Sequence, residues 1–475
     1  MTGGGAVAAI DLGATSGRVI LGRVGRDTLE ATAVARFAND PVRASDGLHW
    51  NTLGLYGAAL DGLRDAFRAE PEIASIGVDS WGVDYGLLRD GRLLGIPFHY
   101  RDERTAHGVE AVHERVPHAE LYARNGLQLL PFTTCYQLAA EPRDILALAD
   151  TLLFTPDLFG YWLTDIARAE RTIASTSGML DAATAEWDDQ LLERIGIPRD
   201  ILAQLITPGE ALGALRPDVA DAIGADASAR VTAVGSHDTA SAVVAVPMDR
   251  TAAAYISCGT WGLVGVEVDR PVLTDAARTA GFTNEGGVDG RTRLLHNVMG
   301  LWVLSEAVRT WERASGEQID FAALLAAAED VDPQSVPVFD VDDGRFLPPG
   351  DMPARIDAWC AEHGIAPPAA SPAAYARSII ESLAQAFADA AVTAGRLGGV
   401  DVRTIHIVGG GSQNRLLCQR TADRSGLPVL AGPVEATALG NVLVQARAQG
   451  FVAGALEDLR ELVARTHVPR RHDPR

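Results

Sequence analysis

Asp11-Leu12-Gly13-Ala14-Thr15-Ser16-Gly17-Arg18 is the segment most diagnostic of this chain's architecture, and the apolar run Val19-Ile20-Leu21-Gly22 follows it. A second stretch of the same kind is Ser257-Cys258-Gly259-Thr260-Trp261-Gly262, followed by Leu263-Val264-Gly265-Val266. Both are typical of a strand, a turn of small residues containing Thr-x-Gly, and a second strand. Glycine-rich turns expose backbone N–H groups, which attract phosphate oxygens. Two copies predict two related lobes that close on a polyphosphate from opposite sides.

The composition is that of an ordinary globular protein, with 47% hydrophobic and 22% charged residues among 475. This length predicts two domains. The formal charge of −21 argues against nucleic acid or an anionic membrane as the main partner, although a nucleotide can still bind locally. The four cysteines lie far apart, so neither a disulfide framework nor a zinc site is expected. We find no signal sequence and no uncharged run of about 18 residues, and we expect a cytoplasmic protein.

Apolar periodicity predicts strands and helices that alternate along the chain. Strands are expected at residues 6–24 (a hairpin), 73–78, 231–234, 252–267 (a second hairpin) and 405–408. Helices are expected at 53–67, over most of 140–164, around 379–391 and from about 414. This alternation is typical of an α/β architecture with mostly parallel central strands. We expect domains at 1–246 and 247–450, then a C-terminal helix and tail at 451–475, with the end after Ala464 frayed and solvated.

The first hairpin carries side chains suited to a phosphate and its metal. It lacks the G-x-x-x-x-G-K-[ST] pattern of a P-loop. Asp11, at the end of the first strand, would suit magnesium bound through water, and Arg18 is placed to donate to phosphate oxygens. A plain structural hairpin is the alternative, and the second copy argues against it. Gly409-Gly410-Gly411, between a strand and a helix, is either a nucleotide contact surface or only a tight turn.

The segment Gly235-Ser236-His237-Asp238-Thr239 is the strongest candidate for chemistry. A carboxylate just beyond a buried strand is placed to take a proton from a substrate hydroxyl, which makes Asp238 a candidate general base. Consecutive residues on an extended chain point to opposite sides, which argues against a Ser-His-Asp triad. The alternative for Asp238 is a helix N-cap, a role that does not exclude catalysis.

The segment Asp79-Ser80-Trp81-Gly82-Val83-Asp84-Tyr85 combines two carboxylates, an aromatic residue and a glycine. Sugar sites use carboxylates to accept from hydroxyls and an aromatic ring to cover C–H faces. A β-turn with Trp81 in the core is an equal alternative. The run Arg101-Asp102-Glu103-Arg104 is expected to be a solvated surface run. Asn297 is expected either to bind a nucleotide or to cap the helix that follows it.

These segments together resemble the FGGY family of carbohydrate kinases. The resemblance runs from about Val7 to Gln445, and its more specific stretches are Ser236-His237-Asp238-Thr239-Ala240-Ser241 and Thr283-Asn284-Glu285-Gly286-Gly287. The family belongs to the sugar kinase/Hsp70/actin superfamily. The resemblance therefore implies a two-domain actin-like ATPase (ribonuclease H-like) fold, with duplicated lobes around a nucleotide cleft. It also implies an ATP-dependent kinase that uses Mg2+.

The resemblance implies roles residue by residue. Asp238 would deprotonate the sugar hydroxyl, and Gly82 and His237 would contact the ketose, with Trp81 and Asp79 in the same sugar segment. The nucleotide would lie against the two glycine turns and the segments beyond them, namely Ala14, Thr15, Ser16, Gly17, Arg18, Gly259, Thr260, Asn297, Gly410 and Gly411. Asp11 and Asp238 would hold Mg2+ through water. The expected ketose is L-rhamnulose, with L-fuculose, a pentulose or glycerol as alternatives, and the protein is expected to be a monomer or a small homo-oligomer.

Three positions depart from the family pattern. Ser305 stands where a nucleotide-contacting glutamine is common, Ile173 where asparagine is common in a Thr-Asn-Ala run, and Glu103 where a small residue is common. The first affects one nucleotide contact, and the other two bear on the sugar pocket. A chaperone-like or filament-forming ATPase and a silent sugar sensor are the alternatives from other classes. The sugar segment argues against the former, and an intact Asp238 argues against both.

Overall fold

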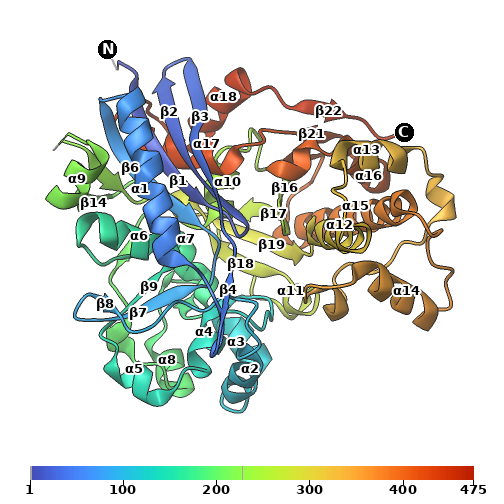
Figure 1. The fold of residues 1–475 in the computed structure, drawn as a ribbon, viewed down its shortest axis with the longest axis horizontal. Coiled ribbons are helices and arrows are strands. Elements are labelled where there is room, and N and C mark those ends of the chain that lie inside the picture. The colour runs from blue at the N-terminus through green and yellow to red at the C-terminus, as the bar shows by residue number, and fades with distance from the viewer. Residues whose placement is uncertain (1–2, 227) are drawn as a thin grey trace. The chain divides into compact units, whose positions relative to one another are not determined.

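Two compact units make up the computed structural model, which describes residues 3–226 and 228–475 (Figure 1). The first unit comprises the chain up to Pro247, Val268–Leu294 and Glu435–His467. The second comprises Met248–Glu267, Leu295–Val434 and Val468–Arg475. Each unit is therefore assembled from separated segments. A continuous division at 246/247 would instead assign Val268–Leu294 and Glu435–His467 to later domains.

The first unit is built on a six-stranded sheet with the order β14-β15-β6-β1-β2-β3. Its strands are β1 (Gly5–Leu12), β2 (Ser16–Gly25), β3 (Thr28–Ala38), β6 (Ile73–Ser80), β14 (Ala211–Ala214) and β15 (Arg230–Thr232). β1 pairs antiparallel with β2, which confirms the first predicted hairpin, and parallel with β6. Every residue of β1 after Gly5 is buried, as expected for a central strand covered on both faces.

Helices cover this sheet. α1 (Thr52–Ala69) packs on β2 and β3, α6 (Thr155–Thr164) packs on β6, and α17 (Ala436–Ala448) packs on β1, β2 and β6. The predicted helix at 53–67 is thereby confirmed; it buries one apolar face and begins where the Asn51 side chain accepts from Gly54 N–H. α17 approaches closely because two strand positions lack a side chain. A Cβ on Gly22 would lie 2.6 Å from Val442, and one on Gly77 would lie 2.5 Å from Asn441.

A second group of elements in the first unit lies between residues 85 and 206. It comprises β7 (Tyr85–Arg89), β8 (Arg92–Leu93), β9 (Thr151–Phe154), α2 (Thr105–His113), α3 (His118–Asn125), α4 (Thr134–Ala139), α5 (Arg143–Leu148), α7 (Arg171–Ala174) and α8 (Asp189–Ile195). The prediction of helix over most of 140–164 is wrong at β9, which pairs with β7. A short apolar run such as Leu152-Leu153-Phe154 suits a buried strand and a buried helix equally, so periodicity alone could not separate them.

The second unit repeats the hairpin and its parallel neighbour. Its strands follow one another in the sheet order β19-β17-β16-β20-β21-β22. They are β16 (Ala253–Cys258), β17 (Gly262–Val268), β19 (Thr292–Val298), β20 (Thr404–Val408), β21 (Val429–Ala431) and β22 (Arg470–His472). β16 pairs antiparallel with β17 and parallel with β20, just as β1 pairs with β2 and β6. The predicted repeat is therefore a repeat of topology as well as of sequence.

Five helices accompany that sheet: α12 (Trp302–Ser315), α13 (Phe321–Glu329), α14 (Met352–Glu362), α15 (Pro372–Gly398) and α16 (Arg415–Ser425). α15 buries the predicted face with Ile379, Leu383 and Phe387 and packs on β16 and α16. α16 begins after Asn414, whose side chain accepts from Leu417 N–H, which confirms the predicted start.

The C-terminal tail is ordered, so the prediction of a frayed end is wrong. Residues Leu456–Thr466 form α18, and β22 pairs antiparallel with β21. The pairing joins backbone groups, and a strand of three polar residues carries no apolar alternation that could have revealed it. The remaining short elements are β4 (Val42–Ala44), β5 (Gly47–His49), β10 (Ala169–Glu170), β11 (Leu180–Asp181), β12 (Glu186–Trp187), β13 (Leu205–Ile206), β18 (Thr283–Gly286), α9 (Pro217–Ile223), α10 (Asp238–Val244) and α11 (Asp275–Thr279).

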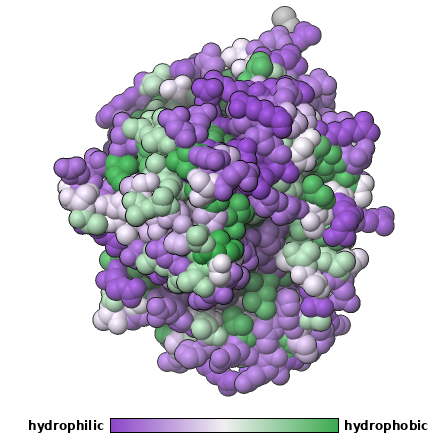
Figure 2. All heavy atoms as spheres, turned by 90° about the vertical axis from the view of Figure 1, so that its right-hand side faces the viewer, coloured by the Kyte–Doolittle hydropathy of each residue, from purple (hydrophilic) through white to green (hydrophobic). Residues whose placement is uncertain are grey.

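The surface is mixed. Figure 2 shows hydrophilic side chains over most of one face, with hydrophobic ones in small patches. Exposed large hydrophobic residues such as Leu53, Phe321 and Val392 lie on separate helices. Among the described residues, no helix combines the length and the apolar character needed to cross a membrane.

Candidate active site

Asp11 and Arg18 form the charged base of the first glycine turn. Asp11 lies near the end of β1 and is buried. Arg18 Nε donates a hydrogen bond of 2.8 Å to Asp11 Oδ2, and the same guanidinium pairs with Glu435. Burial raises the pKa of Asp11, although Arg18 acts to lower it. The turn therefore presents an arginine whose charge is shared between two carboxylates.

The tip of this turn is open. Gly13 N–H donates to Ser16 O at 2.9 Å, and the Asn39 side chain donates to Gly13 O at 2.8 Å. Thr15 and Ser16 are exposed, and β2 already begins at Ser16. Gly17 is therefore a strand residue and not a turn residue; its Cα lies against the Phe37 ring, where a Cβ would be 2.1 Å away.

Asp79 lies beside Asp11. The two residues are paired in the register of β1 and β6, and Asp79 is fully buried. Asn441 Nδ2 donates to Asp79 Oδ2 at 2.6 Å, while Oδ1 has no hydrogen-bond partner among the described residues. Burial, and then the charge of Asp11, raise the pKa of Asp79 well above its ordinary value. Asp79 therefore belongs with Asp11, the carboxylate at the first glycine turn. Because Asp79 is fully buried, a sugar cannot reach its side chain in this structure.

Asp238 is the exposed carboxylate of this group. It is the first residue of α10, and 31% of its side chain is exposed. Thr239 Oγ1 donates to Asp238 Oδ1 at 3.1 Å. The N-cap position is His237, so the alternative of Asp238 as an N-cap is wrong. Asp238 is near enough to raise the pKa of both Asp11 and Asp79 by its charge. The fold thus brings together three carboxylates from three segments, of which one faces outward.

Two residues to which the sequence motifs assign no role hold the His237 ring. Arg293 is fully buried, and its Nη2 lies 3.0 Å from His237 Nδ1 and 3.0 Å from Glu285 Oε2. Glu285 Oε2 also lies 3.2 Å from His237 Nδ1, and His237 Nε2 lies 3.4 Å from Asp238 Oδ1, so the imidazole has a carboxylate on each side. Burial acts to raise the pKa of Glu285, but Arg293 and His237 outweigh it and the pKa is lowered. Glu285 could have been found within Thr-Asn-Glu-Gly-Gly, whereas Arg293 lies in a strand without a motif.

The carboxylate of Asp84 is used inside the protein and is not offered to a sugar. It is buried and accepts from Trp50 Nε1 at 2.6 Å, Trp81 Nε1 at 2.9 Å, Gln137 Nε2 at 2.9 Å and Tyr100 N–H at 3.2 Å. Burial raises the pKa of Asp84 to about 6. The idea that Asp84 accepts from substrate hydroxyls is therefore wrong, because its oxygens already hold the indole rings in place.

The backbone beside this cluster is held in an uncommon conformation. Val83 has φ 69°, a left-handed value that is rare for a β-branched residue. Its N–H donates to Thr176 Oγ1 at 3.1 Å, and its carbonyl accepts from Thr134 Oγ1 at 2.6 Å. Gly82 precedes it and is half-buried. Strain of this kind persists only where the surroundings over-determine it, and it is concentrated at functional sites.

In the second unit, the turn between β16 and β17 exposes Gly259, and Thr260 is half-buried. Trp302 N–H donates to Thr260 O at 3.1 Å. Asn297 lies in β19, five residues before the start of α12, so the alternative that it caps this helix is wrong.

The glycines after β20 differ from one another. Gly410 is exposed, and a Cβ there would meet no atom within 4 Å. Gly411 is buried, and a Cβ there would lie 2.2 Å from Cys258 Sγ. Gly410 therefore offers open backbone to a ligand, whereas Gly411 is required for packing against β16.

The run at 101–104 is partly buried, so the prediction of a solvated surface run is wrong. Arg104 pairs with Glu141 at 2.9 Å, and Asp102 accepts from Leu48 N–H at 2.8 Å. Only Glu103 is exposed among the four. Local charge density could not reveal partners that lie tens of residues away in the sequence.

The two other departures from the family pattern lie in different surroundings. Ile173 is fully buried in a hydrophobic cluster with Phe154 and Met179, so its side chain belongs to the core. Ser305 is half-buried on the first turns of α12.

Each unit thus contains a hairpin with an open glycine turn and a strand that runs parallel to the first strand of that hairpin, and the first unit adds an exposed carboxylate at a helix start. This duplicated topology is that of the actin-like ATPase fold, a class of nucleotide-dependent phosphate-handling proteins. Comparison with known protein families identifies the family within this class. The N-terminal domain of the FGGY family of carbohydrate kinases matches residues 6–245, and its C-terminal domain matches residues 254–449. The chain belongs to the FGGY family of carbohydrate kinases.

Relatives with curated functions are similar over nearly the whole chain. A rhamnulokinase of Bacteroides thetaiotaomicron is 39% identical over 96% of this chain and 93% of its own length. One of Pectobacterium carotovorum is 41% identical over 99% of this chain and 93% of its own length. Among solved structures, gluconate kinase from Lactobacillus acidophilus has a TM-score of 0.80 at 17% identity and covers 100% of this chain and 94% of its own. Plasmodium falciparum glycerol kinase with ADP has a TM-score of 0.77 at 12% identity, covering 99% and 94%.

Proposed function

We propose that this protein transfers the terminal phosphoryl group of ATP to L-rhamnulose, giving L-rhamnulose 1-phosphate and ADP. The observation that carries the proposal is the identity of 39% and 41% with two rhamnulokinases over at least 96% of the chain. Because the reaction consumes ATP, we place it in the cytoplasm.

Asp238 acts as the general base in this proposal. Among the clustered carboxylates it alone is substantially exposed, so a sugar hydroxyl can reach it, and loss of the hydroxyl proton makes the oxygen a better nucleophile. The His237 ring is held by Arg293 and Glu285 on its Nδ1 side, which would orient its Nε2 side toward a ketose oxygen or Asp238. Gly82 would complete the sugar side, whereas the Trp81 ring is buried and packs against Trp50.

The open turn at Ala14, Thr15 and Ser16, together with Arg18, would contact the ATP phosphates. Backbone N–H groups and a guanidinium meet the charge that spreads over the transferring phosphoryl oxygens. In the second unit, Thr260, Asn297 and the open backbone of Gly410 would contact the nucleotide.

The carboxylates of the first unit fit a magnesium ion. Mg2+ prefers oxygen ligands and keeps several waters, and Asp79 Oδ1 is a buried oxygen without a hydrogen-bond partner in the described part of the chain. Within that same part, no three carboxylate, histidine or cysteine side chains are arranged to hold a metal directly. Asp11 and Asp238 would therefore hold the ion through water. When bound, it would neutralise phosphate charge.

Replacing Asp238 with asparagine tests the chemistry. We expect Asp238→Asn to lower kcat by about 10²- to 10⁴-fold, because an amide of the same shape cannot take the proton. The dissociation constant for ATP, measured by calorimetry, should change little. Asp218→Asn, at an exposed carboxylate that pairs with Arg216, is the matched control. Near-normal turnover of Asp238→Asn would remove Asp238 from its role.

A ketose panel tests the substrate. The release of ADP is measured with L-rhamnulose, L-fuculose, pentuloses and glycerol, and kcat/KM should be highest for L-rhamnulose. A higher value for another acceptor would change the assigned sugar while leaving the kinase class intact.

A further inference from the structure

Glu170 is a buried carboxylate that no ion pair of the described residues neutralises. It is 1% exposed and lies at the N-cap of α7. Its oxygens accept from Thr172 N–H at 2.8 Å, Thr172 Oγ1 at 2.5 Å, Ile173 N–H at 3.2 Å and Ser236 N–H at 3.0 Å. The first three bonds are local to α7. The fourth reaches 66 residues along the chain, to the segment that carries Asp238.

Thr172 makes a second connection to the same segment. Its hydroxyl donates to Glu170, which leaves the oxygen lone pairs free to accept from His237 N–H at 3.1 Å. The N–H groups of both residues that precede Asp238 are therefore held from one side, by Glu170 directly and through Thr172. From the other side, Ser80 N–H donates to Ser236 O at 2.9 Å. The entry of the chain into α10 is thus fixed between α7 and the end of β6.

Glu170 is itself held. Its N–H donates to Asp157 Oδ1 at 3.1 Å, and Asp157 Oδ2 has no hydrogen-bond partner in the described residues. Asp157, Glu170 and Ser236 line a cavity of about 20 Å³, enough for one water molecule. A space of this size lies beside the Glu170 carboxylate and offers no room for a substrate.

We propose that Glu170, together with Thr172, is a positioning residue for phosphoryl transfer: it fixes the backbone of Ser236 and His237 so that the Asp238 carboxylate faces the acceptor hydroxyl. The proposal deepens the proposed function and rests on Asp238 being its base. A carboxylate suits this role because it accepts only and can satisfy several N–H donors at once. A glutamine at 170 has one acceptor oxygen and would turn an N–H group toward at least one of those donors.

The test compares Glu170→Gln, Thr172→Val and Thr172→Ser. We expect Glu170→Gln and Thr172→Val to lower kcat by about 10- to 100-fold, because a displacement of about 1 Å at a catalytic group can cost that much. The KM for ATP should stay within about twofold, since neither residue lies in the glycine turns. Thr172→Ser keeps the hydroxyl and should retain near-wild-type kcat. The double variant should lose no more than Glu170→Gln, because both residues act through one connection.

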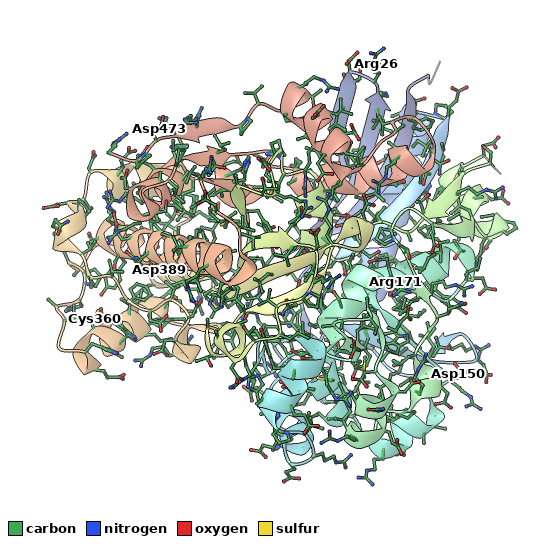
Figure 3. All side chains as sticks on the ribbon, turned by 180° about the vertical axis from the view of Figure 1, so that it is seen from behind. Arg26, Asp150, Arg171, Cys360, Asp389 and Asp473 are labelled. Carbon is green, nitrogen blue, oxygen red and sulfur yellow. The ribbon has the colours of Figure 1, made fainter. Side chains whose placement is uncertain are left out.

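Glu186→Gln is the matched control. Glu186 is exposed and pairs at 2.7 Å with Arg171, the first residue of the same short helix, whose position is labelled in Figure 3. The chemical change is the same as in Glu170→Gln, but no bond to the Asp238 segment is affected. Thermal unfolding of every variant establishes the folded fraction to which kcat is referred.

Hydrogen exchange of the Ser236 and His237 amides supplies a readout that needs no sugar. Exchange should rise about tenfold or more in Glu170→Gln and Thr172→Val, and stay unchanged in Thr172→Ser and Glu186→Gln. Unchanged exchange, or a kcat per folded molecule within twofold of wild type, would overturn the positioning role. Failure of the wild type to phosphorylate L-rhamnulose would instead overturn the assigned sugar, and the exchange result would still decide the role of Glu170.

Discussion

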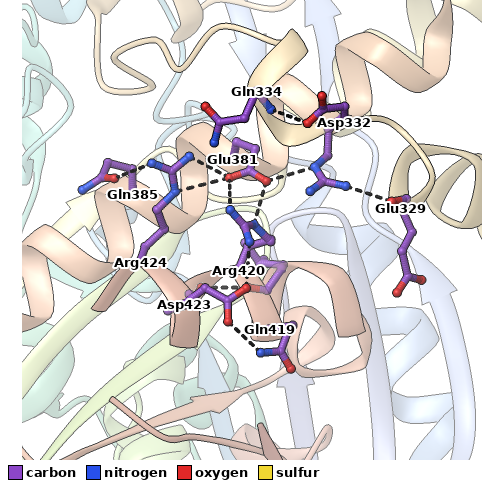
Figure 4. A network of polar contacts seen from close by, with 12 residues as sticks. Glu329, Asp332, Gln334, Glu381, Gln385, Gln419, Arg420, Asp423 and Arg424 are labelled. Carbon is purple, nitrogen blue, oxygen red and sulfur yellow. Dashed lines mark hydrogen bonds and ion pairs between the residues drawn. The ribbon is translucent and has the colours of Figure 1, made fainter. Parts of the chain in front are cut away.

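Two buried glutamates, one in each unit, have opposite kinds of hydrogen-bond partner: one is surrounded by arginines and the other by neutral donors. Glu381 on α15 is fully buried and accepts from Arg377 at 2.9 Å, Arg420 at 2.7 Å and Arg424 at 2.8 Å (Figure 4). Glu170 on α7 is equally buried but receives only neutral N–H and O–H donors. Burial raises the pKa of Glu170 to about 7, whereas the arginines outweigh burial and lower the pKa of Glu381.

The partners of the two carboxylates indicate different structural roles. The three arginines of Glu381 come from α15 itself and from α16, so the cluster ties together two helices of the second unit. Glu170 instead ties a short helix to the backbone before Asp238. The charged partners of Glu381 hold two helices together. The neutral donors of Glu170 let its carboxylate orient the backbone before Asp238, and they leave its pKa raised by burial.

The largest expected effect is at the ion-paired glutamate. Glu381→Gln should lower the free energy of unfolding by about 3–5 kcal/mol. The substitution removes the negative charge that the three neighbouring arginines share, and their positive charges then repel one another. Urea unfolding measures this without screening the ion pairs. Asp401→Asn, at a carboxylate that is 77% exposed, is the control. A loss below about 1 kcal/mol would show that the cluster contributes little beyond packing.

The next effect is a difference in pH dependence. Burial raises the pKa of Glu170 in the folded state from its ordinary value of 4.5 to about 7, so the folded state binds a proton that the unfolded chain has released. Stability should therefore fall as the pH rises from about 4.5 to 7, by up to about 3 kcal/mol. Asp157 and Arg168 line the cavity beside it and are present in both proteins compared, so they do not account for a difference between them.

Urea unfolding of wild type and Glu170→Gln at pH 5 and pH 8 measures this dependence. The wild type should gain stability relative to the variant at pH 5. The wild type and Glu381→Gln should differ by the same amount at both values, because a lowered pKa places that loss of stability below pH 4.5. Equal slopes for all three proteins would contradict the contrast between the two glutamates.

Asp84 is a third buried carboxylate that accepts only from neutral N–H groups, and no catalytic role is proposed for it. Asp84→Ala should lower the free energy of unfolding by about 1–3 kcal/mol at pH 8, because it leaves four buried N–H donors without their acceptor. Fluorescence of Trp50 and Trp81 should shift, since both indoles lose their shared anchor. An unchanged emission spectrum would mean that packing alone holds the rings.

The smallest effect is expected at an exposed ion pair. Arg403→Ala removes a partner of Asp401 in a pair that is 74% and 77% exposed. The free energy of unfolding should change by no more than about 0.5 kcal/mol, because water screens the charges. A change as large as that of Glu381→Gln would refute burial as the cause of the difference.

Much of the architecture could be predicted from the sequence. The two hairpins, the buried strand before Asp79 and the helix face of Ile379 are marked by apolar periodicity and glycine turns, which are local signals. Local signals failed where partners were distant. β9 was predicted as helix because its partner β7 is distant in the sequence. β22 was predicted as a free tail because its pairing with β21 leaves no local pattern.

The candidate site divides in the same way. Asp238 and the two glycine turns are recognisable because their motifs are contiguous. Arg293 and Thr172 are not, since each contacts the segment of Asp238 from more than fifty residues away. Asp84 was misjudged because the four N–H donors that occupy it come from separate segments.

The duplicated hairpins, the family and the segment that carries Asp238 could be identified from sequence, because short-range patterns of glycine, apolar and acidic residues specify them. The folded arrangement is needed to know which carboxylates are paired with arginines and which are held by neutral donors. The same holds for α17, which lies late in the chain but packs on the first sheet, where its Asn441 side chain donates a hydrogen bond to Asp79. The physical reason is that burial and partner charge depend on residues brought together from distant segments, and these set the behaviour of an acidic side chain.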